Sequence, residues 1–169
     1  MPRAAPLHDT KPLLLVDIDG VLSIFGFTQS QHPPGRFLTV DGIVHFISAQ
    51  AGAQLRELSE DFELRWCSGW EEKANDYLPA VLGLPGPLPF ISFERGPSHA
   101  GSHWKLAAIE QATAPQRPLA WIDDGFDERC DAWAAGRRSP TLLVATDPAE
   151  GLLEHHAVAL RRWARALSR

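Results

Sequence analysis

An apolar run that ends in two carboxylates is the stretch that most constrains the fold. Residues 13–20 read LLLVDIDG. Four consecutive apolar residues are typical of a strand buried on both faces, as in a parallel sheet covered by helices. Ligands of such sheets bind beyond the carboxyl ends of the strands, so Asp17 and Asp19 fall where chemistry is usually placed. Gly20 predicts a break in strand geometry that would let both carboxyls turn toward one site, although a plain turn is the alternative.

The composition is that of one globular domain. The chain has 169 residues, of which 44% are hydrophobic and 22% charged, which is enough for a single domain with a core. We expect a flexible tail over 1–10 and one domain over 11–169. The formal net charge of −5 provides no general basic field for a nucleic acid but leaves room for a local basic patch.

The cysteines and the N-terminus bear on the cellular compartment. Cys67 and Cys130 lie in apolar segments, which predicts buried thiols in a reducing compartment, and their spacing matches no zinc pattern. No signal-type apolar segment follows a basic start, and no apolar stretch approaches the roughly 20 residues that span a bilayer. We therefore expect a cytoplasmic protein without membrane contact. The sequence does not indicate an oligomeric state.

Apolar runs alternate with helical patterns along the chain. We expect strands at 11–16, 62–67, 90–93, 119–122 and 141–145. We expect helices at 49–60, 71–82, 103–113, 127–136 and 152–167. This alternation predicts an α/β fold, namely a three-layer, doubly wound and Rossmann-like arrangement around a mostly parallel sheet.

The segment after the first strand predicts a small β-flap beside the first carboxylates. Two apolar pieces, 36–40 and 43–46, flank Asp41-Gly42, which is a hairpin turn signal. Ser48 is placed to cap the helix that follows. Gly83 is placed to end the next helix.

Three of the predicted strands are followed by polar side chains. Asp17 and Asp19 follow the first, Ser68 follows the second, and Asp123 and Asp124 follow the strand at 119–122. The carboxyl ends of parallel strands lie along one edge of a sheet, so we expect these groups to gather. Several carboxylates in close contact cannot all stay ionised without a cation. Oxygen ligands of this kind suit Mg²⁺, which binds through a few carboxylates, waters and substrate phosphate.

This set of residues has the parts of a phosphoryl-transfer site. One aspartate can act as a nucleophile and form an aspartyl-phosphate. A second can protonate the leaving oxygen and then activate water. Ser68 can hold phosphate oxygens, and Lys105, which opens the predicted helix at 103–113, can neutralise the negative charge that develops.

The same four elements, in the same order, resemble the motifs of the haloacid dehalogenase-like (HAD) superfamily of phosphohydrolases. The resemblance spans about 11–146 and is carried by Lys105 and by three stretches: DIDGV at 17–21, WCSGW at 66–70 and WIDD at 121–124. A narrower similarity is to the HAD domain of Swiss Army Knife RNA repair proteins. It rests on WCSGWE at 66–71, WIDD at 121–124, and Asp147 with the later Glu150-Gly151-Leu152.

The resemblance implies a role for each matching residue. Asp17 would be the nucleophile and a metal ligand. Asp19 would be the general acid/base, with its backbone carbonyl on the metal, and its presence favours phosphoryl chemistry over carbon–halogen cleavage. Ser68 would bind the phosphoryl group, and Lys105 would be the lysine of the third motif.

The fourth motif has a pair of aspartates, which the resemblance divides between two roles. Asp124 would be the metal ligand, and Asp123 would support Lys105 or the waters on the metal. Which of the two contacts the metal directly stays open. Asp127 departs from the longer spacing seen in some members of the superfamily and is left as a group outside the immediate shell.

The spacing of the motifs bears on the size of the substrate. Neither the interval from Asp19 to Ser68 nor that from Ser68 to Lys105 has room for a full cap domain. An open site would admit a large phosphorylated substrate such as a phosphoprotein or a nucleic-acid end. The RNA-repair similarity implies an RNA or DNA terminus or a nucleotide.

We therefore expect a Mg²⁺-dependent phosphohydrolase that works through an aspartyl-phosphate. One alternative is a catalytically silent domain of the same fold, used for binding or assembly. Another is a phosphotransferase that passes the phosphoryl group to an alcohol.

Several residues near the expected mouth of the site have two interpretations. For Trp70 and Trp104 we favour packing over stacking on a base. For His99 and His103 we favour solvated loop positions over substrate contacts. Arg36 on the flap and Arg95 in the loop after 90–93 are candidates for contact with a substrate phosphate. The net charge of −5 opposes a nucleic-acid substrate unless four arginines gather near the mouth: Arg36, Arg95, Arg137 and Arg138.

Overall fold

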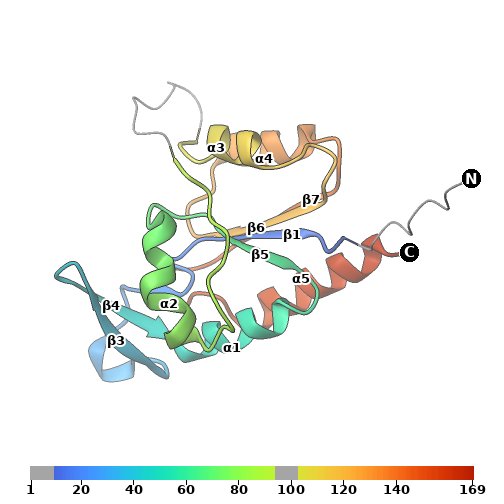
Figure 1. Ribbon diagram of the computed structural model, residues 1–169. Coiled ribbons are helices and arrows are strands. Elements are labelled where there is room, and N and C mark those ends of the chain that lie inside the picture. The colour runs from blue at the N-terminus through green and yellow to red at the C-terminus, as the bar shows by residue number, and fades with distance from the viewer. Residues whose placement is uncertain (1–9, 94–102) are drawn as a thin grey trace, which may run out of the picture.

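The computed structural model describes residues 10–93 and 103–169, and its centre is a parallel sheet (Figure 1). The order of the strands is β5-β1-β6-β7. Their bounds are Leu13–Val16 for β1, Glu63–Trp66 for β5, Leu119–Asp123 for β6 and Thr141–Ala145 for β7. All three neighbouring pairs run parallel, so the predicted α/β, Rossmann-like sheet is confirmed.

Helices cover both faces of this sheet, which gives three layers (Figure 1). One face carries α1 (Ala49–Leu58), α2 (Ala74–Leu82) and α5 (Glu154–Leu167). The other carries α3 (Leu106–Ala112) and α4 (Glu128–Gly136).

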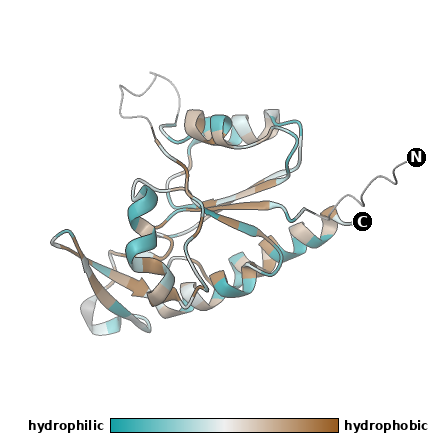
Figure 2. Ribbon diagram, viewed as in Figure 1, coloured by the Kyte–Doolittle hydropathy of each residue, from teal (hydrophilic) through white to brown (hydrophobic). Residues whose placement is uncertain are grey.

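The apolar run in β1 belongs to two cores because successive side chains of a strand point to opposite faces. Leu14 and Val16 pack in the cluster with α1, α2 and α5. Leu13 and Leu15 pack in the cluster with α3 and α4. Each buried leucine contributes about 2 kcal/mol to folding. In Figure 2 the central strands are accordingly hydrophobic, whereas the helices alternate hydrophobic with hydrophilic residues.

A small antiparallel sheet stands beside the parallel one and forms the predicted flap. Its strands are β2 (Ser23–Ile24), β3 (Gly35–Val40) and β4 (Ile43–Ser48), in the order β2-β4-β3, and the 3₁₀ turn η1 (Gln29–Gln31) precedes β3. Asp41 and Gly42 have φ angles of 50° and 80°, as a two-residue hairpin turn of this type requires. Lys73 Nζ lies 2.7 Å from Asp41 Oδ2 and ties the tip of the flap to the main body.

The helix ends follow the predicted signals. Ser48 Oγ accepts a hydrogen bond from Ala51 N at 3.1 Å and caps α1. Gly83, with φ at 71°, ends α2. Asp127, which the sequence placed outside the immediate shell of the site, caps α4. Its carboxylate accepts hydrogen bonds from the backbone and the guanidinium of Arg129.

Some sequence predictions were wrong or only approximate. No strand forms over 90–93, where Phe90 makes a single bridge to Trp66. Pro89 has no N–H to extend this pairing toward the N-terminus. In the other direction β5 ends at Trp66, and the N–H of Phe93 donates to Glu71 Oε1 instead of to a strand. The helix at 71–82 begins with a 3₁₀ turn, η2 (Glu71–Lys73). Residues 1–9 of the predicted tail lie outside the described residues.

The described segments between the motifs contain few helices and strands. From Asp19 to Ser68 it forms only the flap, α1 and β5, and the described residues from Ser68 to Lys105 form η2, α2 and a loop. Among the described residues no inserted cap domain is present, as predicted. None of the helices there has the length and apolar character that crossing a membrane requires.

Candidate active site

The predicted site residues gather at the carboxyl edge of the sheet. Asp17 directly follows β1, and Asp123 is the last residue of the neighbouring strand β6. From β1 the chain runs outward to β5 on one side and then returns to β6 on the other. The order of the strands therefore reverses between β1 and β6, and such a switch point is where open α/β sheets bind their ligands.

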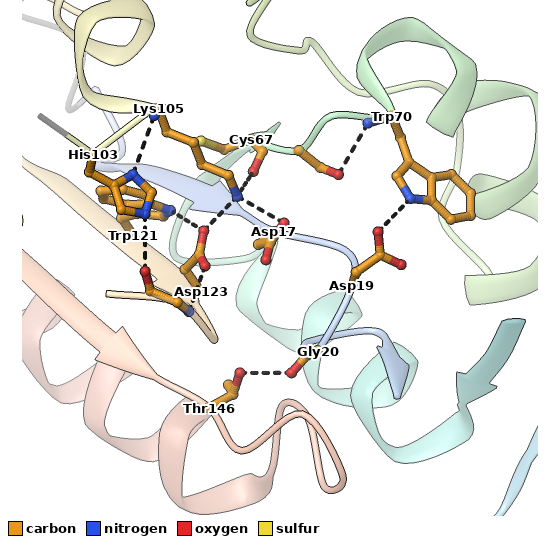
Figure 3. Close-up of polar contacts among 12 residues, drawn as sticks. Asp17, Asp19, Gly20, Cys67, Trp70, His103, Lys105, Trp121, Asp123 and Thr146 are labelled. Atoms are coloured by element: carbon orange, nitrogen blue, oxygen red, sulfur yellow. Dashed lines mark hydrogen bonds and ion pairs between the residues drawn. The ribbon is translucent and has the colours of Figure 1, made fainter. Parts of the chain in front are cut away.

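Lys105 lies at the centre of the site, at the start of α3. Its Nζ is 3.0 Å from Asp17 Oδ1, 2.6 Å from Asp123 Oδ2 and 2.9 Å from the carbonyl oxygen of Cys67 (Figure 3). An ammonium has three N–H donors, and all three have a partner here. Lys105 is only 3% exposed, so these contacts replace the water that it has lost.

Three carboxylates stand together beside this ammonium and form what we call the acidic cluster: Asp17, Asp123 and Asp124. One ligand atom from each lies within 4.8 Å of the others, close enough to hold one metal ion. Asp17 and Asp123 are buried, and Asp124 is half-buried. Carboxylate oxygens are the ligands that Mg²⁺ prefers, so this donor set fits the predicted cation.

The members of the acidic cluster differ in how many oxygen lone pairs are already used. Asp123 Oδ2 accepts from Lys105 and from Trp121 Nε1, and its Oδ1 accepts from Gly125 N. This leaves Asp17 and Asp124 with more free capacity for a cation, which favours the predicted division between Asp123 and Asp124.

Gly20 makes room for the acidic cluster. A Cβ atom there would lie 2.2 Å from Asp124 Oδ2, and the φ angle is 82°. Only glycine combines that conformation with that close approach. The glycine after the two carboxylates is thus required by Asp124, the aspartate that follows β6.

Burial and mutual repulsion shift the titration of these groups. Burial raises the pKa of Asp17 to about 8, with Lys105 opposing the shift and Asp123 adding to it. Burial also raises the pKa of Asp124, helped by the charge of Asp123. Burial alone would lower the pKa of Lys105, but the neighbouring Asp17 and Asp123 raise it above its ordinary value. The Lys105 ammonium therefore stays charged, but its charge is not enough to bring the pKa of Asp17 back to its ordinary range.

The Asp19 side chain is not part of the acidic cluster. It is 51% exposed and accepts a hydrogen bond from Trp70 Nε1 at Oδ2, at 3.0 Å (Figure 3). Its Oδ1 lies 3.5 Å from Nδ1 of His45 in the flap. Asp17 and Asp19 thus serve different parts of the site, and the expected metal contact of Asp19 through its carbonyl stays a prediction.

Ser68 follows β5 inside a tight turn. It is buried, and its Oγ accepts a hydrogen bond from Trp70 N at 3.2 Å. Its carbonyl accepts from Glu71 N at 3.0 Å, and Glu71 has a positive φ of 49°. The turn places Ser68 at the same edge as Asp17, because β5 and β1 are paired in register up to Trp66 and Val16.

Two residues that the sequence analysis missed as structural supports hold the loops of the site. His103 was favoured as a solvated loop residue, but it is buried: its Nδ1 accepts from Lys105 N at 3.3 Å, so Nε2 carries the hydrogen that Gly125 O accepts at 3.0 Å. Thr146 Oγ1 donates to Gly20 O at 2.8 Å (Figure 3). Their positions, two residues before Lys105 and directly after β7, were the available signals.

The remaining flanking residues have mixed outcomes. Trp70 is buried, as the packing interpretation held, whereas Trp104 is 51% exposed. Arg137 binds Thr141 Oγ1 and Arg117 O near the start of β7, on the opposite edge of the sheet from the site, so it does not add positive charge near the mouth. Arg36 is exposed on β3. His99 and Arg95 lie outside the described residues.

Comparisons with known proteins leave the family open. No family model matches the chain, and no curated protein matches it. The similarity to the HAD superfamily rests on the four motifs, and membership stays a prediction. What the geometry adds is that the residues of those motifs lie along one edge of an α/β sheet, where the side chains of Asp17, Asp123 and Asp124 gather beside Lys105.

Proposed function

We propose that the protein is a Mg²⁺-dependent phosphohydrolase that works through an aspartyl-phosphate on Asp17. The observation that carries the proposal is the contact of the buried Lys105 ammonium with both Asp17 and Asp123, inside the acidic cluster at the switch point of the sheet. A structural ion pair alone would not explain the third carboxylate, Asp124, or the glycine that makes room for it.

The need for a cation follows from the titration of Asp17. A nucleophilic carboxyl must be ionised, but burial raises the pKa of Asp17 to about 8, so most of it is protonated at pH 7 without a further positive charge. We propose that Asp17 and Asp124 would hold Mg²⁺ with the Asp19 carbonyl, and that Asp123 supports them. When bound, the cation supplies positive charge to the carboxyls and to the phosphoryl oxygens.

The residues then divide the first half of the reaction. A carboxylate oxygen of Asp17 forms a bond to phosphorus, and the bond from phosphorus to the leaving oxygen breaks. Asp19, in its acid form, gives its proton to that oxygen, which departs as an alcohol. Ser68 holds phosphoryl oxygens, and Lys105 offsets the negative charge shared by Asp17 and the phosphoryl group.

The second half regenerates the enzyme. Asp19, now a carboxylate, takes a proton from water while the water oxygen forms a bond to phosphorus. The bond from phosphorus to Asp17 breaks, inorganic phosphate leaves, and Asp19 is again in its acid form. An alcohol in place of water would make the same site a phosphotransferase.

The open mouth of the site supports a large substrate. Among the described residues no cap domain covers the carboxyl edge. We propose phosphorylated termini of RNA or DNA, or nucleotides, as the substrate class. A phosphatase screen that compares nucleotides, nucleic-acid ends, phosphopeptides and sugar phosphates would identify it.

The direct test is Asp17→Asn assayed on p-nitrophenyl phosphate with and without Mg²⁺. We expect the variant to fold, as judged by circular dichroism, and to lose the metal-dependent hydrolysis. The matched control is Asp76→Asn, which changes an exposed aspartate on α2 and should keep wild-type activity. Full activity in Asp17→Asn would overturn the assignment of the nucleophile. Product analysis with an added alcohol separates hydrolysis from transfer.

A further inference from the structure

The flap reaches the side chain that we propose as general acid/base. His45 lies on β4, and its Nδ1 is 3.5 Å from Asp19 Oδ1. On the other side of the same carboxylate, Trp70 Nε1 donates to Oδ2 at 3.0 Å (Figure 3). Each oxygen of Asp19 therefore faces a ring nitrogen, and the two rings come from different parts of the chain.

His45 is itself held in place by several contacts. Its Nδ1 is 3.0 Å from Ser23 Oγ on the neighbouring strand β2. Its ring meets the ring of Trp70 edge-on, with centroids 4.7 Å apart. The hairpin that carries it is anchored at its tip by Lys73 and Asp41 and along its length by the buried side chain of Ile47. These contacts fix the imidazole without any help from Asp19.

The carboxylate of Asp19 needs such support because it is half exposed. An exposed side chain can rotate, whereas a general acid must stay within hydrogen-bond reach of the leaving oxygen. The indole of Trp70 can only donate, so Oδ2 of Asp19 stays an acceptor in both protonation states. Oδ1 is then the oxygen that carries the transferable proton, and Oδ1 is the oxygen that faces His45.

We propose that His45 is a positioning residue for Asp19, through which the flap sets the geometry of proton transfer to the leaving group. This inference rests on the proposed function. The His45 ring contacts Ser23, Asp19 and Trp70 and, within the described residues, neither the nucleophile nor Lys105, so its effect should be confined to steps in which Asp19 moves a proton.

The leaving group distinguishes this role from a structural one. A p-nitrophenolate ion departs readily without a proton, whereas an alkoxide needs the proton from Asp19. The value of kcat/KM reports on the steps up to and including departure of the leaving group. We expect His45→Ala to lower kcat/KM for an alkyl phosphate about tenfold, which is a part of the 10²–10⁴ that general acid catalysis supplies. The kcat/KM for p-nitrophenyl phosphate should change much less.

Two matched variants complete the experiment. His45→Asn keeps an N–H donor near the place of Nδ1 and should restore most of the lost kcat/KM. Val44→Ala changes the adjacent exposed residue on the opposite face of β4 and should leave both substrates unaffected. Equal losses on both substrates in His45→Ala, or the same losses in Val44→Ala, would overturn the proposal.

A second measurement does not depend on activity. The indole N–H resonance of Trp70 can be assigned in an NMR spectrum by its loss in Trp70→Phe. Both His45→Ala and His45→Asn remove the ring that packs against Trp70, so the difference between these two variants reports on Asp19. We expect His45→Ala, which releases Asp19, to shift the resonance further than His45→Asn, and Val44→Ala to leave it in place. An inactive wild-type protein would overturn the proposed function, and the indole resonance would still decide whether His45 holds Asp19. Equal shifts in His45→Ala and His45→Asn would count against the positioning role.

Discussion

Two regions of the site handle carboxylates in opposite ways. In the acidic cluster, Asp17 and Asp123 are buried and share the ammonium of Lys105. Beside the flap, Asp19 is half exposed; it accepts a hydrogen bond from Trp70 Nε1, and its other oxygen lies 3.5 Å from His45 Nδ1. Because the acidic cluster is buried, changes in its charge should alter the free energy of unfolding and its dependence on pH. Because Asp19 is exposed, changes beside the flap should alter mainly the orientation of its carboxylate. Folding and catalysis should therefore respond differently to changes in the two places.

The largest effect on stability should come from Lys105→Met. The substitution keeps the length of the side chain but leaves buried carboxylates without their cation, which costs about 3–5 kcal/mol. Urea unfolding measures the change in the free energy of unfolding. A loss below about 1 kcal/mol would mean that the ammonium contributes little to folding and that the contrast between the two regions is wrong.

The pH dependence of stability without metal should come next. The unfolded Asp17 carboxyl titrates near 3.8 and the folded one near 8, so between these values the folded state holds the extra proton. Its contribution is fully present below pH 3.8 and is lost as the pH rises through 8. We expect the free energy of unfolding in EDTA to fall across this range by up to about 1.4 kcal/mol per pH unit from this group.

The control for the pH experiment is Asp17→Asn, which should flatten that part of the profile. Mg²⁺ should stabilise the wild-type protein more at pH 8 than at pH 6, because less proton release is then needed for binding. A wild-type profile without this decline would show that Asp17 is already ionised in the metal-free protein.

A smaller effect should separate two glycines with the same backbone conformation. Gly20 and Gly26 both have φ of 82°, but only at Gly20 would a Cβ meet the carboxylate of Asp124, whereas nothing lies within 4 Å at Gly26. Both alanine variants should lose about 1–2 kcal/mol from the left-handed conformation. Gly20→Ala should lose more, and it alone should weaken Mg²⁺ binding in titration calorimetry. Equal behaviour would contradict the role of Gly20 in shaping the cluster.

The smallest effect on stability should follow Asp19→Asn. The side chain is half exposed and the amide oxygen can still accept from Trp70, so the free energy of unfolding should change by no more than about 0.5 kcal/mol. Hydrolysis of an alkyl phosphate should nevertheless fall by about 10²–10⁴ in kcat/KM, because the amide cannot give up a proton as the acid does. A variant that is both stable and active would remove Asp19 from the proposed reaction.

The elements that were predicted correctly depend on neighbours in the chain. The four apolar residues of β1, the Asp41-Gly42 turn and the Ser48 cap each follow from local preferences. The strand expected at 90–93 does not form, because its pairing depends on β5, which ends at Trp66, and an apolar segment does not encode where a distant partner strand ends. The contacts of Trp70 and His45 with Asp19 were not predicted, because they join residues 25 or more positions apart in the chain.

By itself the sequence determined the alternation of strands and helices around the parallel sheet and the carboxyl-edge positions of Asp17, Ser68 and Asp123, because alternation and strand ends are local properties of the chain. Only the tertiary structure decided which carboxylates join the acidic cluster and which lies beside the flap. Pairing of β1 with β6 brings Asp17 to Lys105 and Asp123, and the folding back of the flap takes Asp19 to His45 and Trp70. Two aspartates one residue apart end in different environments because distances across a sheet or from a flap depend on packing, which no local pattern encodes.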